Sequence, residues 1–357
     1  MRILFFILFV VSTQIGFSQS NKEKAKLKAQ DAIRLVDNGQ FALGIKMLEE
    51  AMKLDPDNID YPYEIAYAKY ASKDYEGAVK ILEKVKKKKD ATDQFYQLLG
   101  NSYDMLGKSD KALKTYADGM KRFPKSGKLY LETGIVYLNR EDYDNAIKSF
   151  EDGVKTDPTY SSNYYWLARM FLNSSEEVWG MIYGELFINL ERNTKRTTDI
   201  SKLLYKTYLD KIKIENDTTY KIGFGSNITI NMDQLKDPDN FKLPFPMMVY
   251  SPVMSLAVVG EKSIDIHSLD RIRKRFNELF YEMGHDKNYP NVLFDYQREM
   301  IQAGHMEAYN HWLLLAGDEA GFTEWKDANQ AKWGKFVEWY NNNSIPINED
   351  YYFLRNK

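Results

Sequence analysis

The chain has 357 residues, of which 28% are charged, and a formal net charge of −2 at pH 7. A chain this close to neutral lacks the basic excess of nucleic-acid-binding proteins, so we expect no nucleic-acid partner. It contains no cysteine, which excludes disulfides, zinc–thiolate sites, thiol nucleophiles and an acylated lipoprotein cysteine.

The first residues have the composition of a cleavable secretion signal. Arg2 precedes an apolar run that ends at Val11, and a small-x-small cleavage pattern ends at Ser18. The run is too short to cross a bilayer, which takes about 20 residues. We therefore predict a signal peptide over residues 1–18, an exported protein of the periplasm or envelope that starts at Gln19, and no membrane span after cleavage. An uncleaved anchor is the alternative.

A period of 34 residues runs through the next part of the chain. Small residues recur at two places in each period, with tyrosine or phenylalanine around them and a proline near the end of several units. The first small position holds Ala32, Ala66, Gly100, Gly134 and Ala168, and the second holds Gly44, Ala78, Ala112, Ala146 and Gly180. We count five units, at 25–58, 59–92, 93–126, 127–160 and 161–194.

Each unit is predicted to be a pair of antiparallel helices. The small residues let the two helices approach closely, and a proline such as Pro124 ends the second helix. This pattern resembles the tetratricopeptide-repeat family. The resemblance implies an all-α superhelical solenoid over residues 19–192 that serves as a platform for a protein or peptide partner.

The tripeptide Gly107-Lys108-Ser109 has the same sequence as the end of a phosphate-binding loop, but we interpret it as a turn between two helices. The preceding glycine, Gly100, stands at the wrong spacing, and the residues before the tripeptide have a helical pattern. We expect Gly107 to end one helix and Ser109 or Asp110 to cap the next.

Four consecutive lysines, Lys86 to Lys89, form the sharpest basic feature. They are predicted to end the second helix of repeat two, where cations interact favourably with the helix dipole and reach solvent. A solvated helix end is therefore favoured over a site for an anionic partner.

The resemblance also implies which residues face a partner, because the first helix of each repeat lines the concave face of such a solenoid. The side chains mapped to this groove are Tyr63, Tyr67, Tyr70, Gln97, Asn101, Leu131, Ile135, Leu138, Tyr165 and Arg169. A clamp for a peptide carboxylate is not expected, because lysine is missing at the position that such a clamp uses. The apolar and aromatic groove suits an amphipathic helix or an extended segment with apolar anchors. The alternatives are that these side chains pack between repeats, or that the second domain fills the groove.

The periodicity stops after repeat five, and we predict a mainly helical domain over residues 193–357 with a small β element. A helix is expected near 198–209 and a strand or hairpin within 220–231. Further helices are expected near 251–259, 269–283, 290–303, 305–316 and 324–343. This part looks like the C-terminal region of exported Bacteroidota-type tetratricopeptide-repeat proteins, a resemblance that supplies no catalytic residues.

All four histidines, His267, His285, His305 and His311, fall in this second domain. His305 and His311 lie on different faces of one predicted helix, so they cannot share a metal from it. Neither HExxH nor Gly-x-Ser-x-Gly occurs. We therefore expect no catalytic residue, metal or cofactor, and a non-enzymatic scaffold. The alternative is an exported hydrolase or metal-dependent enzyme with its site in the second domain.

The second helix of repeat five carries apolar residues on more than one side, among them Ile182, Leu186, Ile188 and Leu190. Such a helix must be covered from several directions. We predict that the second domain packs on it, caps the solenoid and makes the two halves one rigid body.

Overall fold

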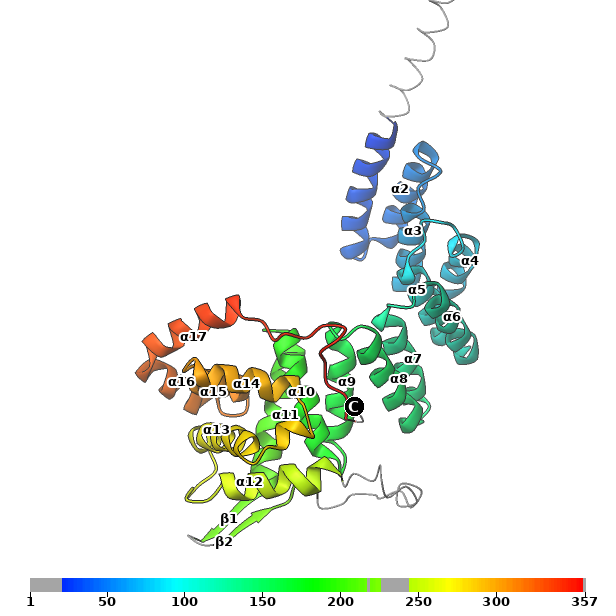
Figure 1. Cartoon of the computed structure of the whole chain (residues 1–357). Coiled ribbons are helices and arrows are strands. Elements are labelled where there is room, and N and C mark those ends of the chain that lie inside the picture. Colours follow the sequence, from blue (N-terminus) through cyan, green and yellow to red (C-terminus); the bar gives the residue numbers. More distant parts are fainter. Residues whose placement is uncertain (1–20, 217–218, 226–243, 356–357) are drawn as a thin grey trace, which may run out of the picture. The chain divides into compact units, whose positions relative to one another are not determined.

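The computed structural model describes residues 21–216, 219–225 and 244–355. The predicted signal peptide therefore lies outside the described residues. Over the described ranges the chain is mostly helical, with paired helices in its first half and a two-stranded hairpin in its second (Figure 1). This confirms the expected fold class. Among these residues, no helix is both long enough and apolar enough to cross a membrane.

Contacts divide the chain into a unit that ends at Ala146 and a unit that starts at Ile147. We call them the repeat unit and the C-terminal unit. The domain bounds predicted from the sequence, 19–192 and 193–357, stay a prediction.

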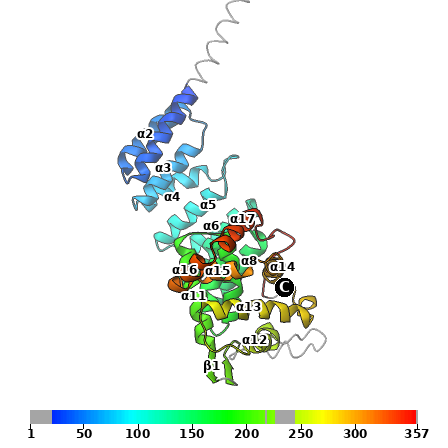
Figure 2. The ribbon, with the colours of Figure 1, turned by 90° about the vertical axis from the view of Figure 1, so that its left-hand side faces the viewer.

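The repeat unit is built of helices stacked in chain order (Figures 1 and 2). After a helical segment at 21–37 come α2 (Phe41–Leu54), α3 (Asp60–Ala71), α4 (Tyr75–Val85), α5 (Asp93–Met105), α6 (Ser109–Arg122), α7 (Gly127–Asn139) and the start of α8 (Tyr143–Thr156). Glycine is required where α5 crosses α6, because a Cβ on Gly100 would lie 2.0 Å from Cε1 of Tyr116.

The turn between the two helices of a repeat takes a left-handed backbone in each of the first four repeats. Gly39, Lys73, Gly107 and Glu141 have φ angles of 77°, 67°, 70° and 59°. A residue with this left-handed backbone conformation ends a helix, and glycine adopts the conformation most readily. The interpretation of Gly107 as a helix end is confirmed. The predicted cap was wrong, because Lys108 occupies the N-cap position of α6 and makes no side-chain cap.

The C-terminal unit contains the rest of α8 and a series of helices around one hairpin. Its elements are α9 (Ser161–Leu172), α10 (Glu177–Leu190), α11 (Lys195–Lys211), β1 (Ile212–Asn216), β2 (Thr219–Ile222), a π-helical turn at Pro246–Tyr250, α12 (Ser251–Ala257), α13 (Ile266–Glu282), a 3₁₀ turn at His285–Lys287, α14 (Val292–Gln302), α15 (Met306–Leu314), α16 (Glu319–Ala328) and α17 (Gln330–Asn342).

Two details of this unit differ from the sequence prediction. The hairpin begins earlier than expected, since β1 directly follows α11 and pairs antiparallel with β2, with Ile212 opposite Ile222. The rest of the predicted β segment, including Ile228 and Ile230, lies outside the described residues. The expected helix at 324–343 is two helices that meet at Asn329.

Helix α10 is the central element of the C-terminal unit. Every residue from Glu177 to Asn189 is buried, and α9, α11 and α14 pack against the helix. The prediction that this helix is covered on more than one side is confirmed. That the two halves form one rigid body stays a prediction.

Candidate partner-binding site

The first helices of the repeats, α3, α5 and α7, lie side by side, with α5 between the other two. We call the row that they form the A-helix face. It holds the predicted groove residues Tyr63, Tyr67, Tyr70, Gln97, Asn101, Leu131, Ile135 and Leu138. The other two predicted groove residues, Tyr165 and Arg169, lie on α9 in the C-terminal unit.

The three tyrosines of α3 differ in how much of their surface is free. Tyr67 is 42% exposed. Tyr63 packs on Phe95, with ring centroids 4.8 Å apart, and burial raises the pKa of its hydroxyl to about 12. Tyr70 packs against the same cluster of buried apolar residues as Tyr63, and its ring meets that of Tyr75 edge-on. Of the three, Tyr67 is therefore the ring most available to a partner.

The three apolar residues of α7 show a similar division. Leu131 is buried at 7% exposure, whereas Ile135 and Leu138 are half-buried. Packing between helices accounts for Leu131, and part of the surface of the other two remains free.

A polar cluster connects α5 to α7. The amide nitrogen of Gln97 donates to Glu132 Oε1 at 2.7 Å. In the orientation that satisfies the whole cluster, the Asn101 amide nitrogen donates to Glu132 Oε2 at 3.2 Å and lies 2.5 Å from the hydroxyl of Tyr116. Burial raises the pKa of Glu132, Asp104 raises it further, and the hydrogen bonds from the two amides lower it in part. Glu132 is therefore a half-buried carboxylate with neutral donors around it.

Glu132 was not among the predicted groove residues, although the repeat contains a signal for it. Glu64 occupies the same place in repeat two and is also half-buried, and burial raises its pKa as well. The recurrence at this register is a weak signal, because Leu98 occupies the position in repeat three.

The two groove residues on α9 are held within the C-terminal unit. Tyr165 is buried at 7% exposure, and its ring lies 5.2 Å from that of Phe187 and 4.9 Å from the Arg196 guanidinium. Its hydroxyl accepts a hydrogen bond from Arg169 at 3.2 Å. Tyr165 thus packs in the core, while Arg169 remains exposed.

The structure brings two of the four histidines together. Nδ1 of His267 lies 3.1 Å from Nε2 of His311, and the His311 ring stacks on Trp325 at 4.4 Å. His285 lies against Phe280 and His305 against Trp339. Within the described ranges, no group of three or more histidine, aspartate or glutamate side chains could hold a metal ion.

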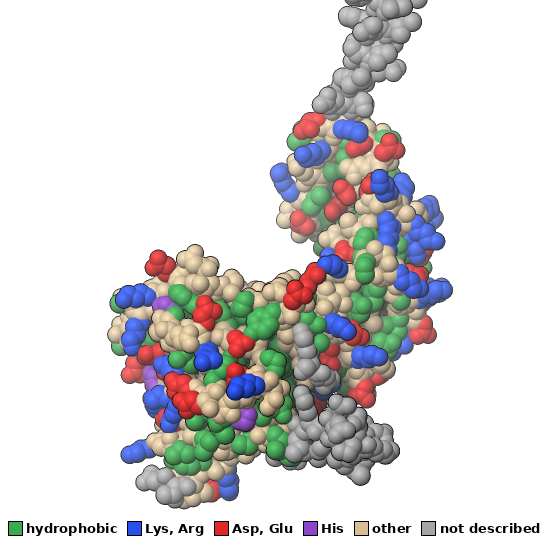
Figure 3. Space-filling view, viewed as in Figure 1, with side chains coloured by type: hydrophobic (Ala, Val, Ile, Leu, Met, Phe, Trp, Pro, Cys, Tyr) green, Lys and Arg blue, Asp and Glu red, His purple; other side chains and the backbone are tan. Residues whose placement is uncertain are grey.

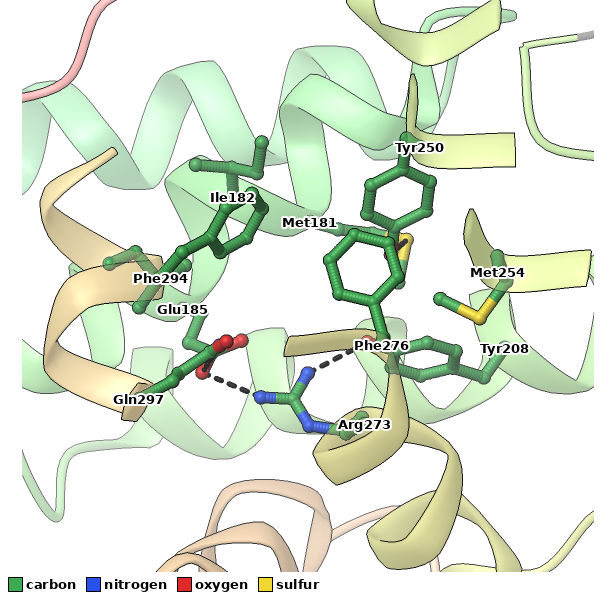
Figure 4. Close-up of a pocket in the computed structure, with 11 residues that line it drawn as sticks. Met181, Ile182, Glu185, Tyr208, Tyr250, Met254, Arg273, Phe276, Phe294 and Gln297 are labelled. Carbon is green, nitrogen blue, oxygen red and sulfur yellow. Dashed lines mark hydrogen bonds and ion pairs between the residues drawn. The ribbon is translucent and has the colours of Figure 1, made fainter. Parts of the chain in front are cut away.

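The C-terminal unit also has an internal polar centre next to a small cavity (Figure 4). Arg273 on α13 donates to Glu185 on α10 at 2.6 Å and to the hydroxyl of Tyr208 on α11 at 2.7 Å. Gln297 and Tyr309 donate to the same carboxylate at 2.7 and 2.9 Å. The cavity measures about 20 Å³, enough for one water molecule. We interpret this centre as a connection between helices rather than as a substrate site.

Comparison with known proteins concerns the first half of the chain. Two sequence families, both described as tetratricopeptide repeat, match residues 35–102 and 98–161. A search of curated proteins found no match.

Solved structures with a similar fold include MamA from Desulfovibrio magneticus RS-1, at 20% identity and a TM-score of 0.38 over 48% of this chain and 97% of that one. PilF of Pseudomonas aeruginosa has 14% identity and a TM-score of 0.44 over 54% and 86%. YrrB, titled a TPR protein with an unusual peptide-binding site, has 16% identity and a TM-score of 0.34 over 50% and 92%. These similarities concern fold alone. Residues 35–161 thus match tetratricopeptide-repeat families, the paired helices there have the period of such repeats, and a further helical region follows them.

Proposed function

We propose that the protein is a non-enzymatic scaffold that holds a protein or peptide partner on the A-helix face. The observation that carries the proposal is Glu132. Its carboxylate is half-buried, it is bonded by the neutral amides of Gln97 and Asn101, and none of the described lysines or arginines forms an ion pair with it. Removing a carboxylate from water without a cation is costly, and a cationic group from a partner would offset that cost.

The A-helix face therefore suits a segment that combines a lysine or arginine with apolar side chains. The cation would form an ion pair with Glu132 and so supply the opposite charge that the amides of Gln97 and Asn101 lack. Tyr67 and Ile135 offer free apolar surface on the same row of helices, which fits anchors of the kind that dominate peptide recognition.

A displayed library of random peptides, selected on the full-length protein, tests this proposal. We expect the selected peptides to share a lysine or arginine near an aromatic or aliphatic residue. Their affinities would then be measured by fluorescence anisotropy. Glu132→Gln keeps the shape and the hydrogen-bond acceptor but removes the charge, so it should weaken binding about tenfold. Tyr67→Ala should weaken it by a similar factor.

Tyr143→Ala is the matched control, because Tyr143 is 55% exposed and lies on α8, outside the A-helix face. This variant should bind as the unaltered protein does. If the selected peptides bind the unaltered protein and all three variants equally, the A-helix face is not the binding surface.

We also propose that the chain is exported and acts in the periplasm or envelope. The support is the sequence of residues 1–18, with its basic start, short apolar run and small residues before Gln19. N-terminal sequencing of the protein recovered from the envelope fraction should begin at Gln19. A chain that begins at Met1 would overturn the proposed cleavage.

A further inference from the structure

The repeat unit has a recess formed by residues of α4, of the turn after it, of α5 and of α6. It measures about 650 Å³ and is lined by four lysines, two from the turn after α4 and two from α6, and by two tyrosines of α5. These six residues are Lys86, Lys87, Lys111, Lys114, Tyr96 and Tyr103. Figure 3 shows lysine and arginine side chains gathered over this part of the unit. We call the recess the basic groove.

Three of the four lysines have no carboxylate to pair with among the described residues. Glu83 forms an ion pair with Lys86 at 2.9 Å and accepts a hydrogen bond from the Tyr103 hydroxyl at 3.0 Å. Asp118, the other acid at the groove, lies 3.5 Å from Lys121. Lys87, Lys111 and Lys114 are exposed. Among the described residues, the one electrostatic contact of these three lysines is the cation–π contact of Lys111 with the Tyr103 ring, at 5.7 Å. The groove thus presents an excess of free positive charge.

Arg122 holds the lysine-bearing end of α4 in place. Its guanidinium, at the end of α6, donates to the backbone carbonyls of Lys86, Lys88 and Lys89 at 2.7, 2.7 and 3.0 Å. These carbonyls belong to the turn that follows α4, where the Lys88 carbonyl also accepts from the backbone N–H of Ala91 at 3.1 Å. Lys88 and Lys89 do not line the groove, as expected for a solvated helix end, whereas Lys86 and Lys87 do. Two lysines of the turn after α4 and two of α6 are therefore held around one recess.

We propose that the basic groove binds an acidic segment of a partner protein, an extended peptide that alternates carboxylates with apolar side chains. The carboxylates pair with the ammonium groups of Lys87, Lys111 and Lys114, and the apolar side chains contact the half-buried ring of Tyr103, since Tyr96 is only 5% exposed. A concave recess does not match a flat membrane surface. The chain's net charge of −2 disfavours a nucleic acid, which carries a phosphate on every nucleotide. The charges and the shape together favour the acidic peptide.

The test is fluorescence anisotropy with a labelled ten-residue peptide that alternates glutamate and leucine. The full-length protein should bind this peptide, and the same peptide with glutamine in place of glutamate should bind at least tenfold more weakly. Lys87→Glu/Lys111→Glu/Lys114→Glu should weaken binding of the glutamate peptide by more than tenfold, because three attractions become repulsions. Binding should also weaken as salt is raised.

The matched control is Lys22→Glu/Lys24→Glu/Lys26→Glu, which makes the same change of net charge on exposed lysines of the first helical segment. It should leave the affinity within about twofold. Equal loss in both triple variants would show attraction to net charge alone and overturn the proposal. So would a labelled oligothymidine of the same length, or vesicles of anionic lipid, that bind more tightly than the glutamate peptide and depend on the same three lysines.

Discussion

Replacing Arg273 with methionine should strongly destabilise the C-terminal unit. The guanidinium is buried at 6% exposure and donates to Glu185, Tyr208 and Asn310 at 2.6, 2.7 and 2.7 Å. Burial lowers the pKa of Arg273, but Glu185, Tyr208 and Tyr309 together raise it by more, so the side chain stays charged. Methionine fills most of the same volume, and the variant therefore tests the loss of charge and hydrogen bonds rather than a cavity.

The expected cost is about 3–5 kcal/mol, the range for removing one partner of a buried ion pair. Glu185 is 3% exposed, so its charge cannot be hydrated when Arg273 is gone. Gln297 and Tyr309 still donate to it, but both are neutral. If the cost comes from that uncompensated charge, neutralising it should restore stability. Glu185→Gln/Arg273→Met should then be more stable than Arg273→Met alone by about 1 kcal/mol or more.

Tryptophan emission measures this unit selectively, because all six tryptophans, from Trp166 to Trp339, lie beyond Ala146. Urea titrations followed by this emission would give the free energy of unfolding of each variant. Arg271→Met is the matched control: Arg271 lies on the same helix, is exposed, and shares Glu261 with a second arginine, so its loss should cost at most about 1 kcal/mol. Equal costs for Arg271→Met and Arg273→Met, or a double variant whose cost is the sum of the single ones, would refute the reasoning.

Two further predictions concern stability. Gly100→Ala should cost the repeat unit about 1–3 kcal/mol, because the new Cβ would lie 2.0 Å from the Tyr116 ring; thermal melts by far-UV circular dichroism would show it. Gly334→Ala, where a Cβ meets nothing within 4 Å, should not lower the melting temperature, and equal melts for both would contradict the packing argument. Burial lowers the pKa of His311, so the unfolded chain takes up that proton more readily than the folded one. The free energy of unfolding should therefore fall as pH drops from about 7 to about 5, by at most about 1.4 kcal/mol per pH unit. His311→Gln should flatten this slope in urea titrations at a series of pH values, and an unchanged slope would assign the pH dependence to other groups.

The architecture of the repeats could be predicted from the sequence because it depends on local features. A small residue at the crossing of two helices and a left-handed turn between them recur at fixed spacing, as Gly100 and Gly107 illustrate. Each repeat packs mainly on its neighbours, so a pattern within one period specifies most of its contacts. The same logic indicated that α10 needs cover, since its apolar residues surround the helix.

The candidate sites were less accessible to sequence reasoning. The A-helix face could be mapped by register, but burial separates Tyr67 from Tyr63, and that depends on which neighbour each ring meets. Glu132 becomes a candidate only when Gln97 and Asn101 of the preceding repeat are seen to bond it.

Local sequence specifies the repeat, its turns and the helical character of the second half of the chain. The pairing of charges, by contrast, depends on the tertiary fold. Arg273 and Glu185 are 88 residues apart, and Arg122 reaches the carbonyl of Lys86 across 36 residues. A helix and its turn depend on residues that are neighbours in the sequence. An ion pair or a groove forms between side chains that are far apart in the sequence, so no local pattern predicts it.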